Sequence, residues 1–395
     1  MKRIFSLVLI SSLLVIPTTH AASKKISVKA LKLVTTISNK DDVAGVVVAG
    51  TIVIVFGTVL DRSFARAIDI NGQELWSIAL DPNSASIATA GAVDSAGNIW
   101  IAGSTSLLRP KPTSSATATS LNPDAVLDSP ARFNPDLNAI ALWKIPAGSS
   151  LPTLYSAEQA APVLITSLAP DQSGISMVGI AQAAKGSSGF VISANSAGEF
   201  GKPLLIGKAS TTLDAVVRHS DGTVTVTGAS GESLGRKKLA GVIDGVIIKI
   251  SKTNTILSVV RSSAPKAKRN WSSATPKLLL AGEVVTRSKT ESAVTKFSST
   301  YTPLWTYRFL STGRVFTLGS TYALFSSTGA IKQLANWLPK KPQSILLSFD
   351  SKGAIVAAYI PPGDQREVIG LISSKELGIL ALISDAERIS IFTLA

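Results

Sequence analysis

The stretch Ala92–Ser106, AVDSAGNIWIAGSTS, decides the predicted fold. An apolar segment reaches Asp94, a turn follows at Ser95–Gly97, and a second strand runs through Ile99–Ile101 until Gly103 ends it. A hairpin cannot bury its own apolar face, so one that recurs along a chain must pack against its copies. The stretch therefore predicts a repeat architecture closed into a ring.

Weaker copies of this hairpin recur, and the clearest is Asp214–Ser230, DAVVRHSDGTVTVTGAS. Its interval from Gly222 to Gly228 equals the interval from Gly97 to Gly103. A second strand pair follows each copy, so each unit predicts four strands. We therefore expect an all-β protein, a β-propeller of about seven four-stranded blades. The expected units are Asp41–Leu80, Ala92–Ser156, Ser167–Gly207, Asp214–Val260, Pro276–Phe309, Gly313–Trp337 and Ser344 to the C-terminus.

The first half of each unit resembles the bacterial SBBP-type (seven-bladed β-propeller) repeat, which pairs a D-x-x-G-N turn with a strand ending in G-x-T-x-S. The second halves, such as NAIALWKI and DGVIIKIS, are similar to the closing strands of that repeat. RAIDINGQELWSIAL, Arg66–Leu80, also resembles the pyrroloquinoline-quinone-type repeat through Asp69, Gly72 and Trp76. The first resemblance implies a fold but no chemistry. The second implies an electron-transfer enzyme in some relatives and a scaffold in others.

Both ends of the chain suggest processing and closure. Residues 1–22 combine Lys2 and Arg3, an apolar run and a Thr19–Ala21 cleavage site, as in a secretory signal peptide. We expect a secreted or cell-envelope protein with no membrane span after signal removal. Residues 23–395 form one predicted propeller domain, in which Ser23–Lys40 is a candidate for closing the ring. Residues 107–137, rich in Pro, Ser and Thr, are expected to be an inserted surface loop.

Composition limits the chemistry. The 395 residues are 45% hydrophobic and include no cysteine, which excludes disulfides and thiol nucleophiles, including the vicinal disulfide common in quinoprotein dehydrogenases. Removing Lys2 and Arg3 from the 39 basic residues leaves 37 against 25 acidic ones. A basic exported protein attracts anionic partners such as wall polymers or acidic polysaccharide, although scattered charge also serves solubility.

Candidate catalytic groups are few. His219 is the one histidine outside the signal segment, so histidine metal pairs are excluded, and its place before Asp221 and Gly222 favours a turn role over a catalytic triad. Ser263–Lys266 matches S-x-x-K but is expected to form an exposed loop. Aspartates recur at the starts of turns, which indicates a structural role. These are Asp69, Asp94, Asp221 and Asp350. We predict no catalytic, cofactor or metal site.

Arg261–Lys277, RSSAPKAKRNWSSATPK, is the main candidate binding segment. It gathers basic side chains around a tryptophan, a mixture suited to polyanion or glycan contact, while a solvated loop is the plainer alternative. The proposed contacts are Lys266, Lys268, Arg269 and Trp271. Trp76, Trp305 and Trp337 lie near strand-pair ends and are expected to pack between blades.

The sequence therefore predicts an exported, monomeric, non-enzymatic propeller. It would act as a binding or scaffold module for an extracytoplasmic protein, a glycan or an anionic polymer, without specific nucleic-acid recognition. The alternative is a propeller enzyme, either a quinone-linked oxidoreductase or a polysaccharide-cleaving enzyme. Carboxylates clustered with Arg or Lys in the central channel would favour the enzyme, and an apolar channel would favour the scaffold.

Overall fold

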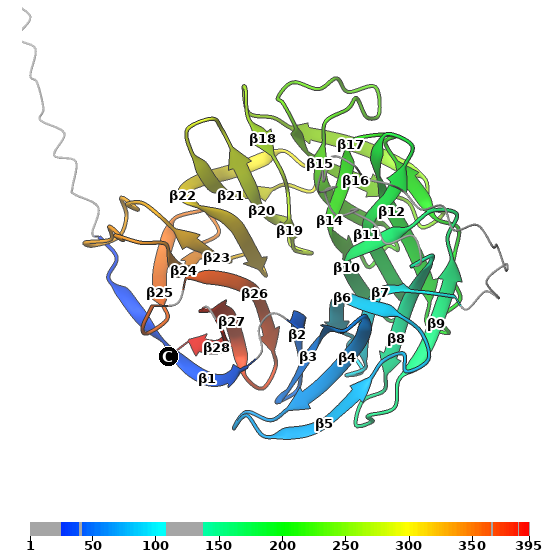
Figure 1. Cartoon of the computed structure of the whole chain (residues 1–395). Helices are drawn as coiled ribbons and strands as arrows, with labels where there is room; N and C mark the ends of the chain where they lie inside the picture. Colours follow the sequence, from blue (N-terminus) through cyan, green and yellow to red (C-terminus); the bar gives the residue numbers. More distant parts are fainter. Residues whose placement is uncertain (1–24, 39–41, 108–136, 365, 386, 395) are drawn as a thin grey trace, which may run out of the picture.

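Strands arranged radially around a central axis make up the fold (Figure 1). The structure is a computed structural model that describes residues 25–38, 42–107, 137–364, 366–385 and 387–394. The predicted signal segment and nearly all of the predicted insertion lie outside these residues. No helix within the described ranges has the length and apolar character needed to cross a membrane.

Four sheets of four antiparallel strands each follow the chain in order from the axis outwards. The first contains β2 (Val43–Ala49), β3 (Ile52–Val59), β4 (Arg62–Ile68) and β5 (Glu74–Ala79), and the second β6 (Ser86–Val93), β7 (Ile99–Thr105), β8 (Ala139–Ile145) and β9 (Thr153–Glu158). The third contains β10 (Val163–Asp171), β11 (Gly174–Ala183), β12 (Gly186–Asn195) and β13 (Leu204–Ile206), and the fourth β14 (Thr211–Arg218), β15 (Val224–Ser230), β16 (Asp244–Ile250) and β17 (Ile256–Ser262).

The remaining strands form one hydrogen-bonded sheet of twelve. They are β18 (Lys268–Arg269), β19 (Ser273–Ala274), β20 (Leu279–Val285), β21 (Thr290–Phe297), β22 (Pro303–Leu318), β23 (Tyr322–Ser327), β24 (Gln343–Phe349), β25 (Ile355–Ile360), β26 (Glu367–Ser374), β27 (Gly378–Ser384), β28 (Ile389–Leu394) and β1 (Val28–Ile37). The long strand β22 pairs with β21 through its first half and with β23 through its second half, which joins neighbouring strand sets. The number of blades therefore stays a prediction.

The two ends of the chain meet in one sheet, as predicted for ring closure. Leu31–Ile37 of β1 pairs antiparallel with β28, the last strand, while Val28–Ala30 pairs parallel with β25. Leu31 and Ile37 are buried and the side chains between them are mostly exposed, which matches the alternation in the sequence. The first strand therefore covers two sheet edges that would otherwise be unpaired.

Burial separates the middle strands from the outer ones. The middle strands β7, β15 and β16 are almost completely buried because a neighbouring sheet packs on each of their faces. The outer strands β5 and β9 alternate exposed and half-buried residues because only one of their faces meets a neighbour. The core therefore lies between sheets, with Trp143 as one of its largest fully buried side chains.

The glycine interval that identified the repeat has a structural cause. A Cβ on Gly103 would lie 1.8 Å from the carbonyl oxygen of Ile87, and one on Gly228 would lie 2.1 Å from that of Thr212. In both units the inner strand carries an irregularity in register opposite the glycine. The bulged backbone approaches so closely that no side chain fits.

Two expected units have the wrong boundaries. Residues 328–342 connect β23 to β24 as a loop, so the expected strand pair within Thr321–Trp337 is wrong. β24 and β25, expected to begin the last unit at Ser344, instead pair in sequence with β22 and β23. The prediction placed a unit at Gly313 because the interval from Gly313 to Gly319 equals that from Gly97 to Gly103. In the structure this interval spans the inner half of β22 and not a turn and its following strand.

The antiparallel order gives the ring two different ends. One end, the turn face, carries the short connections between first and second and between third and fourth strands. The other end, the loop face, carries the connections between second and third strands and those from one sheet to the next. Both candidate segments, the insertion after β7 and the basic segment after β17, are attached at the loop face.

Candidate functional site

At its turn-face end the central channel is lined mainly by apolar side chains from the inner strands. A cavity of about 500 Å³ at the turn-face end meets β2, β6, β10, β14, β19, β22 and β26. Among the described residues that line it, only Asp171 and Arg218 are charged, and their Oδ2 and Nε atoms are 2.7 Å apart. Burial alone would raise the pKa of Asp171, but hydrogen bonds from Arg218 and Ser173 outweigh it and lower that pKa. The channel therefore presents a neutralised ion pair.

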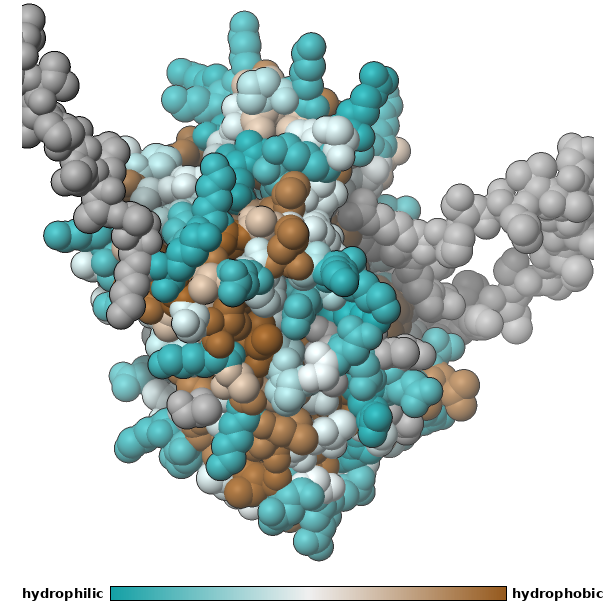
Figure 2. Space-filling view, turned by 90° about the vertical axis from the view of Figure 1, so that its left-hand side faces the viewer, coloured by the Kyte–Doolittle hydropathy of each residue, from teal (hydrophilic) through white to brown (hydrophobic). Residues whose placement is uncertain are grey.

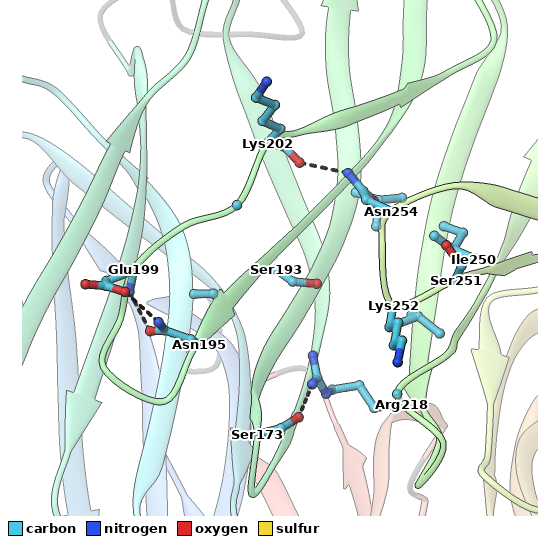
Figure 3. A pocket seen from close by; sticks show the side chains of 15 residues that line it. Ser173, Ser193, Asn195, Glu199, Lys202, Arg218, Ile250, Ser251, Lys252 and Asn254 are labelled. Atoms are coloured by element: carbon cyan, nitrogen blue, oxygen red, sulfur yellow. Dashed lines mark hydrogen bonds between the residues drawn. The ribbon is translucent and has the colours of Figure 1, made fainter.

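A second cavity, of about 490 Å³, lies between the third and fourth sheets at the turn face (Figure 3). Its polar lining is largely bonded to itself. Asn254 Nδ2 donates to the carbonyl of Lys202, Asn195 Nδ2 donates to Glu199, and Arg218 donates to Ser173. These bonds tie neighbouring turns together, so the polar groups act mainly as structural links.

The recurring aspartates make turns, as predicted. In each case one carboxylate oxygen accepts a hydrogen bond from the backbone N–H two residues later, at distances of 2.8 to 2.9 Å. These four residues are Asp69, Asp94, Asp221 and Asp350. Asp94 also accepts from Trp100 Nε1 at 2.8 Å, which extends the turn into the buried part of β7.

His219 lies in the same kind of turn. The backbone N–H of His219 donates to the carbonyl of Thr223, and its backbone carbonyl accepts from the N–H of Gly222. The ring atom Nε2 is 2.8 Å from the Thr225 hydroxyl. Thr225 in turn lies 2.7 Å from the Tyr301 hydroxyl. Burial lowers the pKa of His219, with a smaller opposing effect of Asp221. The histidine is thus held in a turn by hydroxyl contacts.

The basic segment after β17 divides into buried and exposed members. Trp271 is fully buried against Phe297, with ring centroids 5.6 Å apart, so its ring does not reach the surface where a ligand would lie. Placing Trp271 at a glycan contact is therefore incompatible with its burial. No local sequence pattern indicates this burial, because the space for the ring comes from Gly245 of β16, where a Cβ would lie 2.7 Å from the indole.

The two arginines of the segment support the structure around the candidate surface. Arg261 donates through Nε to Asp244 Oδ2 at 3.0 Å, and both side chains are nearly or completely buried. Arg269 lies over the Trp271 ring, with Cζ 4.3 Å from a ring centroid, and burial together with nearby Arg308 lowers the pKa of Arg269 to about 10. Neither guanidinium lies free in solvent.

Lys266 and Lys268 are exposed, and the structure places other basic side chains near them. The loop between β15 and β16 carries Arg236, Lys237 and Lys238, and the loop between β20 and β21 carries Arg287; all four are exposed. Sequence reasoning missed them because they lie far along the chain. The run Arg-Lys-Lys directly after Gly235 was the sequence pattern that could have indicated a second basic loop.

The three tryptophans that were expected to pack between blades do so. Trp337 is buried, and Trp305 packs half-buried against the same core cluster. Trp305 stacks on Phe349 with ring centroids 5.0 Å apart. Trp76 packs against the cluster shared by the first and second sheets.

The comparisons with known proteins support the fold. No family model matches the chain, and no curated protein sequence does either. Among solved structures, the WD40 domain of Toxoplasma gondii coronin is similar with a TM-score of 0.52 and 8% identity, covering 94% of this chain and 89% of that one. Sqt1 of Chaetomium thermophilum bound to the N-terminus of ribosomal protein L10 has a TM-score of 0.48 and 12% identity, over 92% and 100% of the two chains.

These comparisons leave the resemblance to SBBP-type and quinone-type repeats as a prediction. The strand order, the central channel and the coronin structure together identify the fold class but not the repeat family. The chain has an all-β fold of the β-propeller type.

Proposed function

We propose that this protein is an exported, non-enzymatic propeller that holds a macromolecular partner on its loop face. The observation that carries the proposal is the cavity at the turn-face end of the channel. Propeller enzymes require reactive groups gathered in one cavity. Here the cavity is mainly apolar and its two charged residues are bonded to each other. The fold is also similar to that of the WD40 domain of coronin.

The loop face suits this function because its connections differ widely in length. Residues 231–243, 263–267 and 328–342 lie there, whereas no connection described on the opposite face is longer than eight residues. Binding residues are found preferentially on loops that a rigid scaffold positions. Export is proposed from the character of residues 1–22.

A photo-crosslinking experiment tests the proposal. A photoreactive amino acid is placed at Ser288 or Lys340 on the loop face, at Asn71 or Ser95 on the turn face, or at Ala92 in the channel. After irradiation in the producing cells, we expect high-mass adducts from the loop-face positions only. Adducts confined to Ala92, or to the turn face, would contradict the proposal and favour the enzymatic alternative.

N-terminal sequencing of the fractionated protein tests export, with a start near Ala22 expected.

A further inference from the structure

Exposed basic side chains gather on three neighbouring loops of the loop face. Hydrophilic side chains project from the top of the molecule in Figure 2, the level at which Figure 1 places β17 and β18. Among the described residues, no ion pair shorter than 4.0 Å involves any of six of these side chains. They are Arg236, Lys237, Lys238, Lys266, Lys268 and Arg287, and we call them the basic surface.

Backbone hydrogen bonds hold the three loops side by side. Val242 N–H donates to the carbonyl of Ala267 at 3.0 Å, and Arg269 N–H donates to the carbonyl of Ile243 at 2.9 Å. Lys268 is paired across the sheet with Val285, from which the third loop departs. The charges therefore come together through the fixed backbone, although their sequence positions span about fifty residues.

Two members of the basic surface lie at tight turn tips. Gly235 and Arg236 have φ values of 54° and 61° between the paired residues Leu234 and Lys237, as in the mirror-image turn that favours glycine. Lys266 has φ 54° in the turn closed by the bond from Ala267 N–H to the Ala264 carbonyl. A charged side chain at a position that favours glycine costs stability, which points to a role beyond the turn.

Three acidic residues in or next to these loops are already engaged. Asp244 is buried against Arg261, and Glu291 bonds both Lys289 and Arg308. Glu232 accepts hydrogen bonds from three successive backbone N–H groups, of Lys208, Ala209 and Ser210. Burial alone would raise the pKa of Glu232, but these bonds outweigh it and lower that pKa. The basic surface is therefore left with positive charge that these carboxylates do not pair.

We propose that the basic surface binds a linear acidic polysaccharide, and this proposal rests on the proposed function. A single small anion would need a closed pocket, because each exposed contact with a lysine contributes only a small free energy. A linear polymer contacts several dispersed cations at once and releases counterions from each. The burial of Trp271 leaves no aromatic platform for stacked bases here, which favours a charged sugar chain over a single-stranded nucleic acid.

The test uses the full mature chain, with dextran sulfate and polygalacturonate as probes and a double-stranded DNA fragment as a third. Binding is measured across a series of salt concentrations. The variant R236G/K266G removes two charges and places glycine where the backbone favours it. The control K352S/K375S removes two exposed lysines from turns on the opposite face. All variants are compared by thermal unfolding to verify that each is folded.

We expect wild-type protein to bind both polysaccharides and R236G/K266G to bind them about tenfold more weakly at low salt, with a shallower salt dependence. The control should bind within about twofold of wild type. Equal losses in both variants would mean that net charge alone attracts the polymer and would overturn the proposal, as would tighter binding of DNA than of either polysaccharide. If wild-type protein binds neither polysaccharide but still gives crosslinks from the loop-face positions, this inference is overturned while the proposed function stands.

Discussion

The turn face and the loop face are built from the same strands but differ in how they use charge. On the turn face, Asp69, Asp94 and Asp350 each accept two backbone hydrogen bonds from their own turn. On the loop face, Arg236, Lys237 and Lys266 project from turn tips without an ion-pair partner among the described residues. These aspartates are thus bonded within their own turns, whereas these basic side chains have no carboxylate partner among the described residues.

This difference separates structural repetition from candidate function. A residue that recurs at the same place in successive units is explained by the turn it stabilises, because one binding site needs no copies. The side chains that do not recur lie on loops of unequal length, and those loops cost the fold little to vary. The comparison predicts that removing a charge bonded within the fold will lower stability, whereas removing a charge of the basic surface will weaken binding.

The largest loss of stability should come from substituting Asp244, a buried residue at the loop-face end of β16. Asp244 is fully buried and accepts hydrogen bonds from Arg261, Ala240 and Gly241. D244A leaves a buried guanidinium without its partner, so we expect the free energy of unfolding to fall by about 3–5 kcal/mol. Urea denaturation measures it. D364A, which breaks an exposed ion pair with Arg366, should leave the free energy of unfolding nearly unchanged, and a similar loss in both variants would contradict the assignment.

A smaller loss is expected on the turn face from D94A. The carboxylate of Asp94 accepts a hydrogen bond from a backbone N–H of its own turn and another from the indole N–H of buried Trp100. Removing the carboxylate loses the first bond and leaves the buried indole donor unpaired. We expect a loss of about 2–3 kcal/mol in the free energy of unfolding. D350A is the matched variant because its turn has no indole bond, and about 1 kcal/mol is expected there. Equal losses would show that the indole bond contributes nothing.

Acid should weaken the turn face before it affects the basic surface. Burial would raise the pKa of Asp94, but bonds from Trp100 and Asn98 outweigh it and hold the folded-state pKa below 3.8. The ionised carboxylate therefore stabilises the fold above about pH 4, and that contribution is lost as the pH falls through the folded-state pKa. The stability difference between wild type and D94N should shrink between pH 5 and pH 3. Dextran sulfate binding should stay constant from pH 8 to pH 5, because lysine and arginine remain charged. A binding change in that window would implicate another group.

The smallest effect on stability is expected from R236G alone. The side chain is exposed and its backbone has φ 61°, so glycine relieves the turn while raising the entropy of the unfolded chain. We expect a change within about 0.5 kcal/mol in the free energy of unfolding and a measurable loss of polysaccharide binding. A clear loss of stability would show that Arg236 has a structural role, and would move it to the same class as the turn-face aspartates.

Periodicity alone predicted much of the architecture. The alternation of apolar and polar residues in Ala92–Ser106 and its copies predicted the hairpins. The interval from Gly97 to Gly103 marks the position at which the backbone of a bulged strand closely approaches the neighbouring strand. It failed at Thr321–Trp337, where apolar residues such as Trp337 fill a loop buried against the core. Local pattern does not distinguish an apolar loop from a strand, because both bury side chains.

The candidate site could be predicted only in part. Lys266 and Lys268 were found from the basic composition of their own loop, whereas Arg236 and Arg287 join them through strand pairing that no local pattern encodes. Trp271 shows the converse: next to basic residues in the sequence, it is drawn into the core by the space beside Gly245.

The sequence by itself determined the strands, the turns and the closing role of the first strand, because these depend on side-chain alternation and on turn chemistry within a few residues. Only the tertiary structure decided which charges meet. Whether Arg261 is a ligand contact or the partner of a buried carboxylate depends on Asp244, a residue on the neighbouring strand. Packing and pairing between distant segments set that choice, and these are properties of the closed ring.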